Sequence, residues 1–533
     1  MNEIVMQAKS VAKIALIVLL AGALASACAM LLIPYHSGTY TRETIQGMYQ
    51  QPDDSVQVAF FGTSAPLSAF SPAKLYEVQG VGGYNCSTSV QPIIMSYYLL
   101  KDLMRHQAGS LQTVVIDPSI IVDTSEAELA SAWAERVLIC MQPSLVKLEA
   151  THALIEAYPV EALEQYLPIL KYHSRWNGLK EADFDLGKSV SATSFSRGQF
   201  IRYRANVEDE AEAQAITPNN QGITESIDSN TADLEKRWEP SNKKYLDEFV
   251  AYCRDQGIQV VFVKVPRMDW DDSSHDCLQH LANTYDVPFL DFNLPGVFEA
   301  CDLSYAVDFV DNKHPNIHGS EKLTRYMGEY LVSRYDYPVL DSTVTAALDA
   351  DVEKYRLCEE DGELLYCTDF GAYLDYLQRD RYTVFIVVRG DASAGMTEEV
   401  RKKASALGLQ NLATLGEGEA YLAIMNKGKL VTGRYAKSPD QSVRLSGQYK
   451  DGEIVITKTN FQKGASIAPL FKLESGGTQS GDFATILVDE EDCSENGEGI
   501  NIAVFNWENG ELIDTACFNT HTDMARTSDV AVD

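Results

Sequence analysis

A serine, a histidine and an aspartate in this sequence have the types and the spacing needed for nucleophilic acyl transfer. Ser64 follows the apolar run 55–62, and far downstream Asp311 lies three residues before His314. On a turn, this spacing lets the carboxylate hold one imidazole nitrogen while the other nitrogen faces the serine hydroxyl. Pro315 disfavours helix at the histidine, which suits a loop. The pattern predicts Ser64 as nucleophile, His314 as base and Asp311 as the residue that orients the base.

Buried strands that alternate with helices must position these residues. The runs 55–62, 113–116 and 258–263 are apolar and rich in β-branched residues, and helical patterns separate them. This alternation predicts a parallel sheet with helical crossovers, and ligands bind at the carboxyl ends of such strands. Ser64 lies at that edge, whereas Lys264, at another strand end, is either structural or a contact at the edge of the substrate site. Taken separately, each feature is an ordinary turn or helix cap, and only their order within this alternation points to a site.

Several separated blocks of the sequence resemble those of SGNH/GDSL-type hydrolases. The blocks are the stretches 60–64, 84–92, 172–176, 264–270 and 311–314. The closer similarity is to the membrane-anchored branch that includes the teichoic acid D-alanylation protein DltD and bacterial polysaccharide O-acetylation proteins. It covers about residues 55–335. The resemblance implies a flavodoxin-like three-layer α/β/α domain in which the serine forms an acyl-enzyme and the acyl group passes to water or to a glycan hydroxyl.

The second of these blocks departs from the pattern of the branch. The branch usually carries Asn-Leu-Gly-x-Ser-Gly-Gln, but Cys86, Ser87 and Val90 here replace the leucine and both glycines. Loss of glycine restricts close approach of the backbone, which puts the oxyanion hole in doubt. The polar residues that remain for contact with the oxyanion or the substrate are Asn85, Ser87 and Gln91, and each could equally be a turn or core residue. A working site and a degenerate one therefore both stay open.

Arg175 and Trp176 are candidates for an acceptor groove, because tryptophan stacks on sugars and arginine pairs with acidic groups. The alternative is a structural tryptophan packed on the core with the arginine at its rim. His318 lies four residues after His314, a spacing that suggests a metal pair on a helix. Pro315 argues against a helix there, and no third ligand is evident, so neither a metal nor another cofactor is expected.

The N-terminal region contains an uncharged apolar stretch from Ile14 to Pro34. Its 21 residues would span ~30 Å as a helix, the thickness of the hydrocarbon core of a bilayer. Lys9 and Lys13 precede the stretch, which predicts a cytoplasmic N-terminus and a single-pass protein of a bacterial cell membrane. A signal peptidase site at 25–27 and a lipoprotein box at Cys28 are alternatives. All three place most of the chain outside the cytoplasm.

Composition and charge narrow the classes of partner and site. The chain has 533 residues, which predicts two or three domains of ~100–200 residues. Its formal net charge of -32 would repel phosphate backbones, so nucleic acid is an unlikely partner. The ten cysteines include no CxxC pair, which argues against a paired-cysteine zinc site. Cys358 and Cys367 could close a short disulfide loop, or the cysteines could be buried small hydrophobic residues.

The C-terminal part resembles an interleukin-like EMT inducer (ILEI/PANDER) domain. The segments that carry this resemblance are 382–388, 391–395, 499–505 and 510–518, and it covers about residues 360–520. It implies a compact β-sandwich-like α/β unit that binds a glycan or a protein and performs no chemistry of its own. The alternative is a domain that only packs against the first.

These interpretations divide the chain into five parts. They are a cytoplasmic tip with a transmembrane anchor (1–35), an SGNH-like domain (36–340) with a polar insertion (206–238), a connection (341–358), an ILEI-like domain (359–520) and a tail (521–533). The predicted function is that of an extracytoplasmic serine acyl-esterase or O-acyltransferase that acts on a polysaccharide or teichoic-acid-like glycan of the cell envelope. The resemblance also implies a multispanning membrane O-acyltransferase as partner. The alternative is a catalytically inert envelope scaffold that binds glycan or protein.

Overall fold

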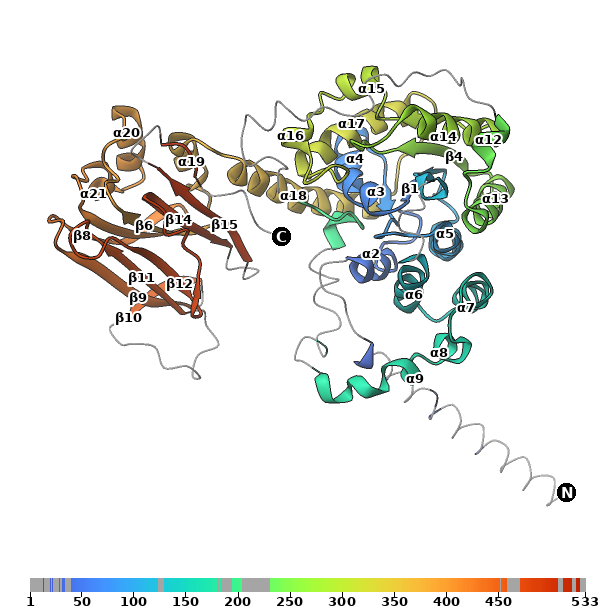
Figure 1. Ribbon diagram of the computed structural model, residues 1–533, viewed down its shortest axis with the longest axis horizontal. Helices are drawn as coiled ribbons and strands as arrows, with labels where there is room; N and C mark the ends of the chain where they lie inside the picture. The colour runs from blue at the N-terminus through green and yellow to red at the C-terminus, as the bar shows by residue number, and fades with distance from the viewer. Residues whose placement is uncertain are drawn as a thin grey trace. The chain divides into compact units, whose positions relative to one another are not determined.

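The chain forms two compact units, Met1–Arg356 and Leu357–Asp533, and the boundary falls within helix α18 (Ser342–Leu365). The computed structural model (Figure 1) describes the residues 40–122, 129–179, 194–203, 231–450, 452–457, 470–506, 511–519 and 524–527, together with residues 13, 20, 22, 28, 31–33 and 183. Of the predicted polar insertion, residues 206–230 lie outside this described part.

A five-stranded parallel sheet forms the centre of the first unit. Its strands lie in the order β2-β1-β3-β4-β5, which is the order of flavodoxin-like doubly wound sheets. The strands are β1 (Val58–Phe61), β2 (Gly83–Asn85), β3 (Thr113–Ile116), β4 (Gln259–Lys264) and β5 (Phe289–Asp291). The strands are short and almost entirely buried, as expected for a sheet that is covered on both faces.

Helices cover the two faces of this sheet and bury alternate residues of its strands. Val58 and Phe60 of β1 pack in a core with residues of α3, α4 and α17, whereas Ala59 and Phe61 pack with residues of α5 and α13. The helices of this unit, with its short 3-10 turns, are α2 (Thr41–Met48), α3 (Ser64–Ala69), α4 (Pro72–Gln79), α5 (Ile93–Gln107), η1 (Ser119–Ile121), α6 (Ala130–Cys140), α7 (Leu145–Ala157), α8 (Ala162–Tyr166), α9 (Pro168–Tyr172), η3 (His173–Gly178), η5 (Ser194–Ser196), α12 (Thr231–Glu235), α13 (Pro240–Asp255), α14 (Asp272–Thr284), α15 (Pro295–Ala300), α16 (Tyr305–Asp308) and α17 (Ile317–Val332).

The prediction of an N-terminal membrane-spanning helix, and with it a single-pass place in the cell membrane, is corrected by the structure. Within the described residues, no helix is both long enough and apolar enough to cross a membrane. The longest described helix, α18, has 24 residues but carries acidic and basic side chains along its length, and the others are shorter than the ~20 residues that a span needs. Most of the stretch 14–34 lies outside the described residues, and Cys28 is described as partly buried.

Two antiparallel sheets of five strands each make up the second unit. The first has the order β15-β14-β6-β7-β8 and the second β10-β9-β11-β12-β13. The strands are β6 (Thr383–Arg389), β7 (Ala420–Asn426), β8 (Lys429–Ala436), β9 (Ser442–Lys450), β10 (Glu453–Thr457), β11 (Leu470–Gly476), β12 (Ala484–Val488), β13 (Glu491–Asp492), β14 (Gly499–Asn506) and β15 (Glu511–Phe518).

Apolar side chains from both sheets of the second unit form one core between them. Phe385 of β6 and Phe471 of β11 pack against each other there with tilted rings, whose centroids are 5.0 Å apart. The opposite face of the first sheet packs against α19 (Phe370–Tyr376), α20 (Glu398–Ala406) and α21 (Gln410–Ala413). None of the ten cysteines forms a disulfide, so the suggested bond between Cys358 and Cys367 is not present.

Candidate active site

Ser64 lies just after the carboxyl end of β1, beyond a sharp turn at Gly62 that requires glycine. Gly62 has φ +148°, and a Cβ at this position would lie 2.6 Å from Cγ of Pro66 and 3.3 Å from Cβ of Asp117. Thr63 is the extended N-cap residue, and Ser64 is the first residue of α3. The serine is therefore partly exposed at the sheet edge where parallel α/β sheets bind ligands.

The loop between α16 and α17 (residues 309–316), called the triad loop below, brings a histidine and an aspartate to this serine. The Val310 amide donates to the His314 carbonyl at 2.8 Å and closes the loop. The Asp311 carboxylate accepts from the amides of Lys313 and His314, both at 2.9 Å. Nδ1 of His314 lies 2.6 Å from Oδ2 of Asp311, and Nε2 lies 2.7 Å from Oγ of Ser64. Aspartate, histidine and serine thus form one continuous hydrogen-bonded chain.

The charges of Asp311 and His314 favour transfer of a proton from the hydroxyl of Ser64 to His314. Burial by itself raises the pKa of Asp311, but hydrogen bonding and attraction to the His314 ring, with the two backbone amides, lower the pKa to about 2. The carboxylate is therefore ionised at neutral pH and accepts only, so the ring proton sits on Nδ1. Nε2 of His314 is then free to accept the hydroxyl proton of Ser64. The His314 side chain is 12% exposed and that of Asp311 45%.

Asn85, which belongs to the block 84–92, binds helix α3 through its side-chain amide. Its Nδ2 donates to the carbonyls of Pro66 at 2.9 Å and Phe70 at 3.0 Å, and its Oδ1 accepts from the Ser87 amide at 3.1 Å. Both amide hydrogens are thereby used on backbone carbonyls. The structure places Asn85 as a residue that fixes the helix carrying Ser64, with no donor left for an oxyanion.

The rest of the second block is a closed, buried loop. Nε2 of Gln91 donates to the Cys86 carbonyl at 2.9 Å and so spans the loop. Val90 has φ +48°, a left-handed conformation that glycine adopts without strain and a β-branched residue does not. The hydroxyls of Ser87 and Thr88 are buried and have no hydrogen-bond partner within the described part of the chain. The segment after β2 stays paired with β1, because the Cys86 amide donates to the Phe60 carbonyl at 2.8 Å and the Thr88 amide to the Gly62 carbonyl at 3.3 Å. By strand alternation, the side chain of Ser87 therefore lies on the same side of the sheet as that of Asn85, which contacts α3.

Arg175 and Trp176 are not brought to the triad in the described structure. Both lie in η3, and Arg175 pairs with Asp183 and donates to the carbonyl of Leu32 at 3.2 Å. Trp176 is 67% exposed. In Figure 1 the neighbouring helix α9 lies well apart from α3 within this unit. The described residues show no contact between Trp176 and the triad, and the role of the pair in an acceptor groove stays a prediction.

An ion pair at the carboxyl ends of two neighbouring strands was not foreseen from the sequence. Nζ of Lys264, at the end of β4, lies 3.1 Å from Oδ2 of Asp117, directly after β3, and both side chains are almost fully buried. The Val265 amide donates to the same carboxylate oxygen at 3.3 Å. The position of an acid and a base after adjacent predicted strands is the sequence signal that could have revealed this pair.

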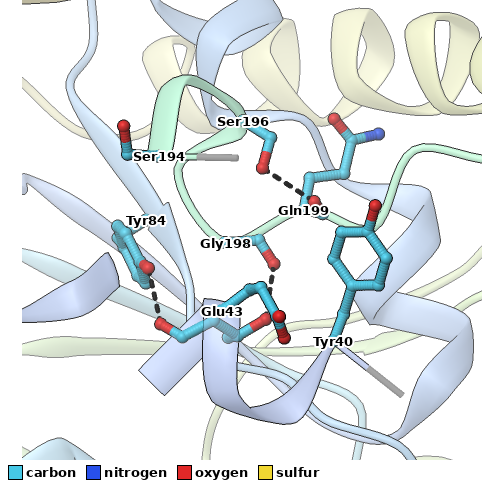
Figure 2. A pocket seen from close by; sticks show the side chains of 8 residues that line it. Tyr40, Glu43, Tyr84, Ser194, Ser196, Gly198 and Gln199 are labelled. Carbon is cyan, nitrogen blue, oxygen red and sulfur yellow. Dashed lines mark hydrogen bonds between the residues drawn. The ribbon is translucent and has the colours of Figure 1, made fainter. Parts of the chain in front are cut away.

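A shallow hollow beside α2 and η5 contains none of the triad residues (Figure 2). Two of its polar side chains are bound within the wall: Tyr84 donates to the Thr44 carbonyl at 2.6 Å, and Ser196 donates to the Gln199 carbonyl at 2.8 Å. The lining residues are Tyr40, Glu43, Thr44, Tyr84, Ser194, Ser196, Gly198 and Gln199.

The described residues include no cluster of three or more histidine, cysteine, aspartate or glutamate side chains able to hold a metal ion. His314 lies in the triad loop and His318 is the second residue of α17, so the two do not share a helix face.

Comparison with known proteins finds a similarity that begins in α18 and lies mostly in the second unit. The family model described as Interleukin-like EMT inducer matches residues 350–429, which run from α18 to the first residue of β8. A search of the curated proteins finds no significant match to the chain. The predicted ILEI-like character of the C-terminal part is thus confirmed over the matched residues, which do not include the triad.

Proposed function

We propose that the first unit is a serine acyl-esterase or O-acyltransferase of the SGNH/GDSL type, with Ser64 as nucleophile, His314 as general base and Asp311 as its orienting partner. The observation that carries the proposal is the unbroken contact from Asp311 through His314 to Ser64, at 2.6 Å and 2.7 Å. The strand order and the glycine turn before Ser64 support the proposal further. They match a doubly wound sheet with the serine at the edge where such sheets bind ligands.

In the proposed reaction, Oγ of Ser64 attacks the ester carbonyl carbon and its proton passes to Nε2 of His314. The tetrahedral intermediate collapses when the leaving alkoxide takes that proton, which leaves the acyl group as an ester on Ser64. Water or a sugar hydroxyl then gives a proton to His314 and attacks the acyl carbon, and the proton returns to Oγ as the product leaves. Asp311 stays ionised and stabilises the imidazolium in each half of the cycle.

The oxyanion would be held by donors at the start of α3 and by the second block. Ser64 and Ala65 occupy the first turn of α3, whose amides have no acceptor within the helix. The unpartnered hydroxyl of Ser87 faces the same side of the sheet and could supply a further donor. Each such donor typically contributes about 10²- to 10³-fold to the rate.

We take the substrate to be an acyl ester of a glycan, because the blocks that surround the triad resemble those of polysaccharide O-acetylation proteins. The ILEI-like part would then bind the same glycan. A multispanning O-acyltransferase as acyl donor follows from the same resemblance alone.

The second candidate is a catalytically inert scaffold, and one specific observation favours it. The side-chain amides of Asn85 and Gln91 are both committed to backbone carbonyls, and Val90 holds a conformation suited to glycine. A second block built in this way offers fewer oxyanion donors than the family pattern.

A fluorophosphonate probe separates the two candidates, because it reacts only with an activated serine. We expect the full chain to be labelled, S64A to be unlabelled and S144A to be labelled like the wild type. Ser144 is a suitable control because it is a partly buried N-cap serine near the Asp102 carboxylate, with no imidazole among its described partners. A folded wild-type chain that takes up no probe would contradict the enzymatic proposal. An S64A chain that is labelled as well as the wild type would contradict it too.

A further inference from the structure

A buried carboxylate at the end of β5 gathers donors from three elements. Asp291 accepts from Nε1 of Trp270 at 2.9 Å, and its Oδ2 lies 2.8 Å from Nδ1 of His275. Its other oxygen accepts from the backbone amide of Asn293 at 2.8 Å and from its side-chain Nδ2 at 2.7 Å. These contacts fix the orientation of the Asn293 side chain, which is itself buried.

Asn293 in turn holds the loop between β4 and α14 (residues 265–271), called the β4–α14 loop below. Its Oδ1 accepts from the Arg267 amide at 2.7 Å, and its Nδ2 donates to the Val265 carbonyl at 3.3 Å. The same end of the loop is also anchored by the Val265 amide, which donates to the Asp117 carboxylate at 3.3 Å. A single asparagine side chain therefore ties two points of one loop to the end of β5.

The β4–α14 loop makes a direct backbone contact with the triad loop. The Met268 amide donates to the Asn312 carbonyl at 2.8 Å, and Asn312 lies between Asp311 and the residues whose amides bind its carboxylate. Asn293 is thus connected to the triad through only two links, its bond to Arg267 and the adjacent bond from Met268.

We propose that Asn293 is a positioning residue for the catalytic triad. This inference rests on the proposed function of the site. Asn293 holds the β4–α14 loop, which binds Asn312 and so positions His314, whose Nε2 lies 2.7 Å from Oγ of Ser64. Without the asparagine, the Asp311–His314 turn can move away from the serine, and a displacement of about 1 Å at a reacting group costs about 10²-fold in rate.

Asn293→Ala tests the proposal on the purified full chain, with Asn501→Ala as the matched control. Asn501 is also buried and also accepts from a loop amide and donates to a loop carbonyl, both of Gly497, but it lies in the second unit. We expect N293A to lower the rate of fluorophosphonate labelling and kcat for an aryl acetate about 10- to 100-fold, with KM changed less than about twofold. N501A should keep wild-type rates. Equal rates in N293A and wild type, at equal folded fraction, overturn the proposal.

Hydrogen exchange separates failure of this inference from failure of the proposed function. N293A should speed exchange at the amides of Val310, Lys313 and His314, which N501A should leave unchanged. If the wild-type chain is not labelled, the proposed function fails, but the exchange comparison still shows whether Asn293 positions the triad loop. Unchanged exchange in N293A contradicts the positioning role in either case.

Asn293→Asp is a second variant that tests the same proposal if the alanine variant does not fold. The aspartate retains the acceptor for the Arg267 amide but places a second carboxylic group against Asp291, where one shared proton can replace the lost donor. We expect the ratio of N293D to wild-type labelling rates to fall as the pH rises and that proton leaves. A ratio that is constant with pH and close to one contradicts the proposal.

Discussion

Asp311→Asn changes the protonation pattern of the triad while leaving its backbone in place. Oδ1 of the new side chain can still accept from the amides of Lys313 and His314, which the carboxylate binds at 2.9 Å. The new amide NH₂ would replace Oδ2, which lies 2.6 Å from Nδ1 of His314. The NH₂ can only donate, so Nδ1 must become an acceptor and the ring proton must move to Nε2. Nε2 then faces Ser64 as a donor and cannot act as base.

The expected effect of D311N is large on activity and small on stability. In a serine triad, the wrong histidine tautomer lowers kcat by about 10⁴-fold. The free energy of unfolding should change by less than about 1 kcal/mol, because the turn keeps its two backbone hydrogen bonds. Asp311→Ala removes those bonds as well and should lose both activity and stability, the latter by about 1–3 kcal/mol for this partly exposed carboxylate.

The assay is the second-order rate of fluorophosphonate labelling, measured beside urea unfolding of the same preparations. Asp341→Asn is the matched control, since Asp341 also accepts from a backbone amide two residues ahead, that of Thr343 at 2.8 Å, but has no histidine among its described partners. D341N should be labelled like the wild type. If D311N is also labelled at the wild-type rate, or loses labelling only in proportion to its unfolded fraction, the assignment of Asp311 is refuted.

Three further predictions concern stability and the serine turn. The pKa of Asp311 is about 2 in the folded protein against an ordinary value of 3.8, so its contribution to stability is full above about pH 4 and is lost as the pH falls towards 2. Because the side chain is 45% exposed, this contribution is about 1 kcal/mol, and urea unfolding should show the wild-type advantage over D311N shrinking between pH 6 and pH 2.5. Gly62→Ala should abolish labelling and lower the melting temperature, whereas Gly178→Ala, where no atom lies within 4 Å of the new Cβ, should do neither. Asn85→Ala should destabilise the protein by about 1–3 kcal/mol in chemical unfolding, because the Phe70 carbonyl loses the Asn85 donor and the Pro66 carbonyl keeps only the Phe70 amide as donor.

The sequence predicted the members of the site that depend on local geometry. Ser64 was placed by a strand that ends at glycine, and Asp311 and His314 by a spacing that closes a turn, and the structure brings all three within hydrogen-bond distance. The catalytic roles of the three remain a prediction. The C-terminal resemblance rested on strand motifs that are also local, and the family match confirms it over 350–429.

The parts that the sequence did not predict depend on contacts between distant segments. No local sequence pattern indicates that the Asn85 side-chain amide reaches carbonyls fifteen to nineteen residues earlier in the chain. Nor does any local pattern indicate that Asn293 binds a loop that follows another strand. Trp176 was chosen for its chemistry alone, and the structure places it without a described contact to the triad. The membrane anchor was wrong because it rested on the apolar composition of 14–34, whereas no described helix combines that length with that composition.

Peptide mapping of the full chain, quenched in acid during turnover of an aryl acetate, shows directly whether Ser64 is the nucleophile. We expect an acetyl group on Ser64 that is absent from S64A and present in S144A. The absence of any acyl-enzyme in a folded wild-type chain, or an acyl group carried by a serine outside the triad, would contradict it.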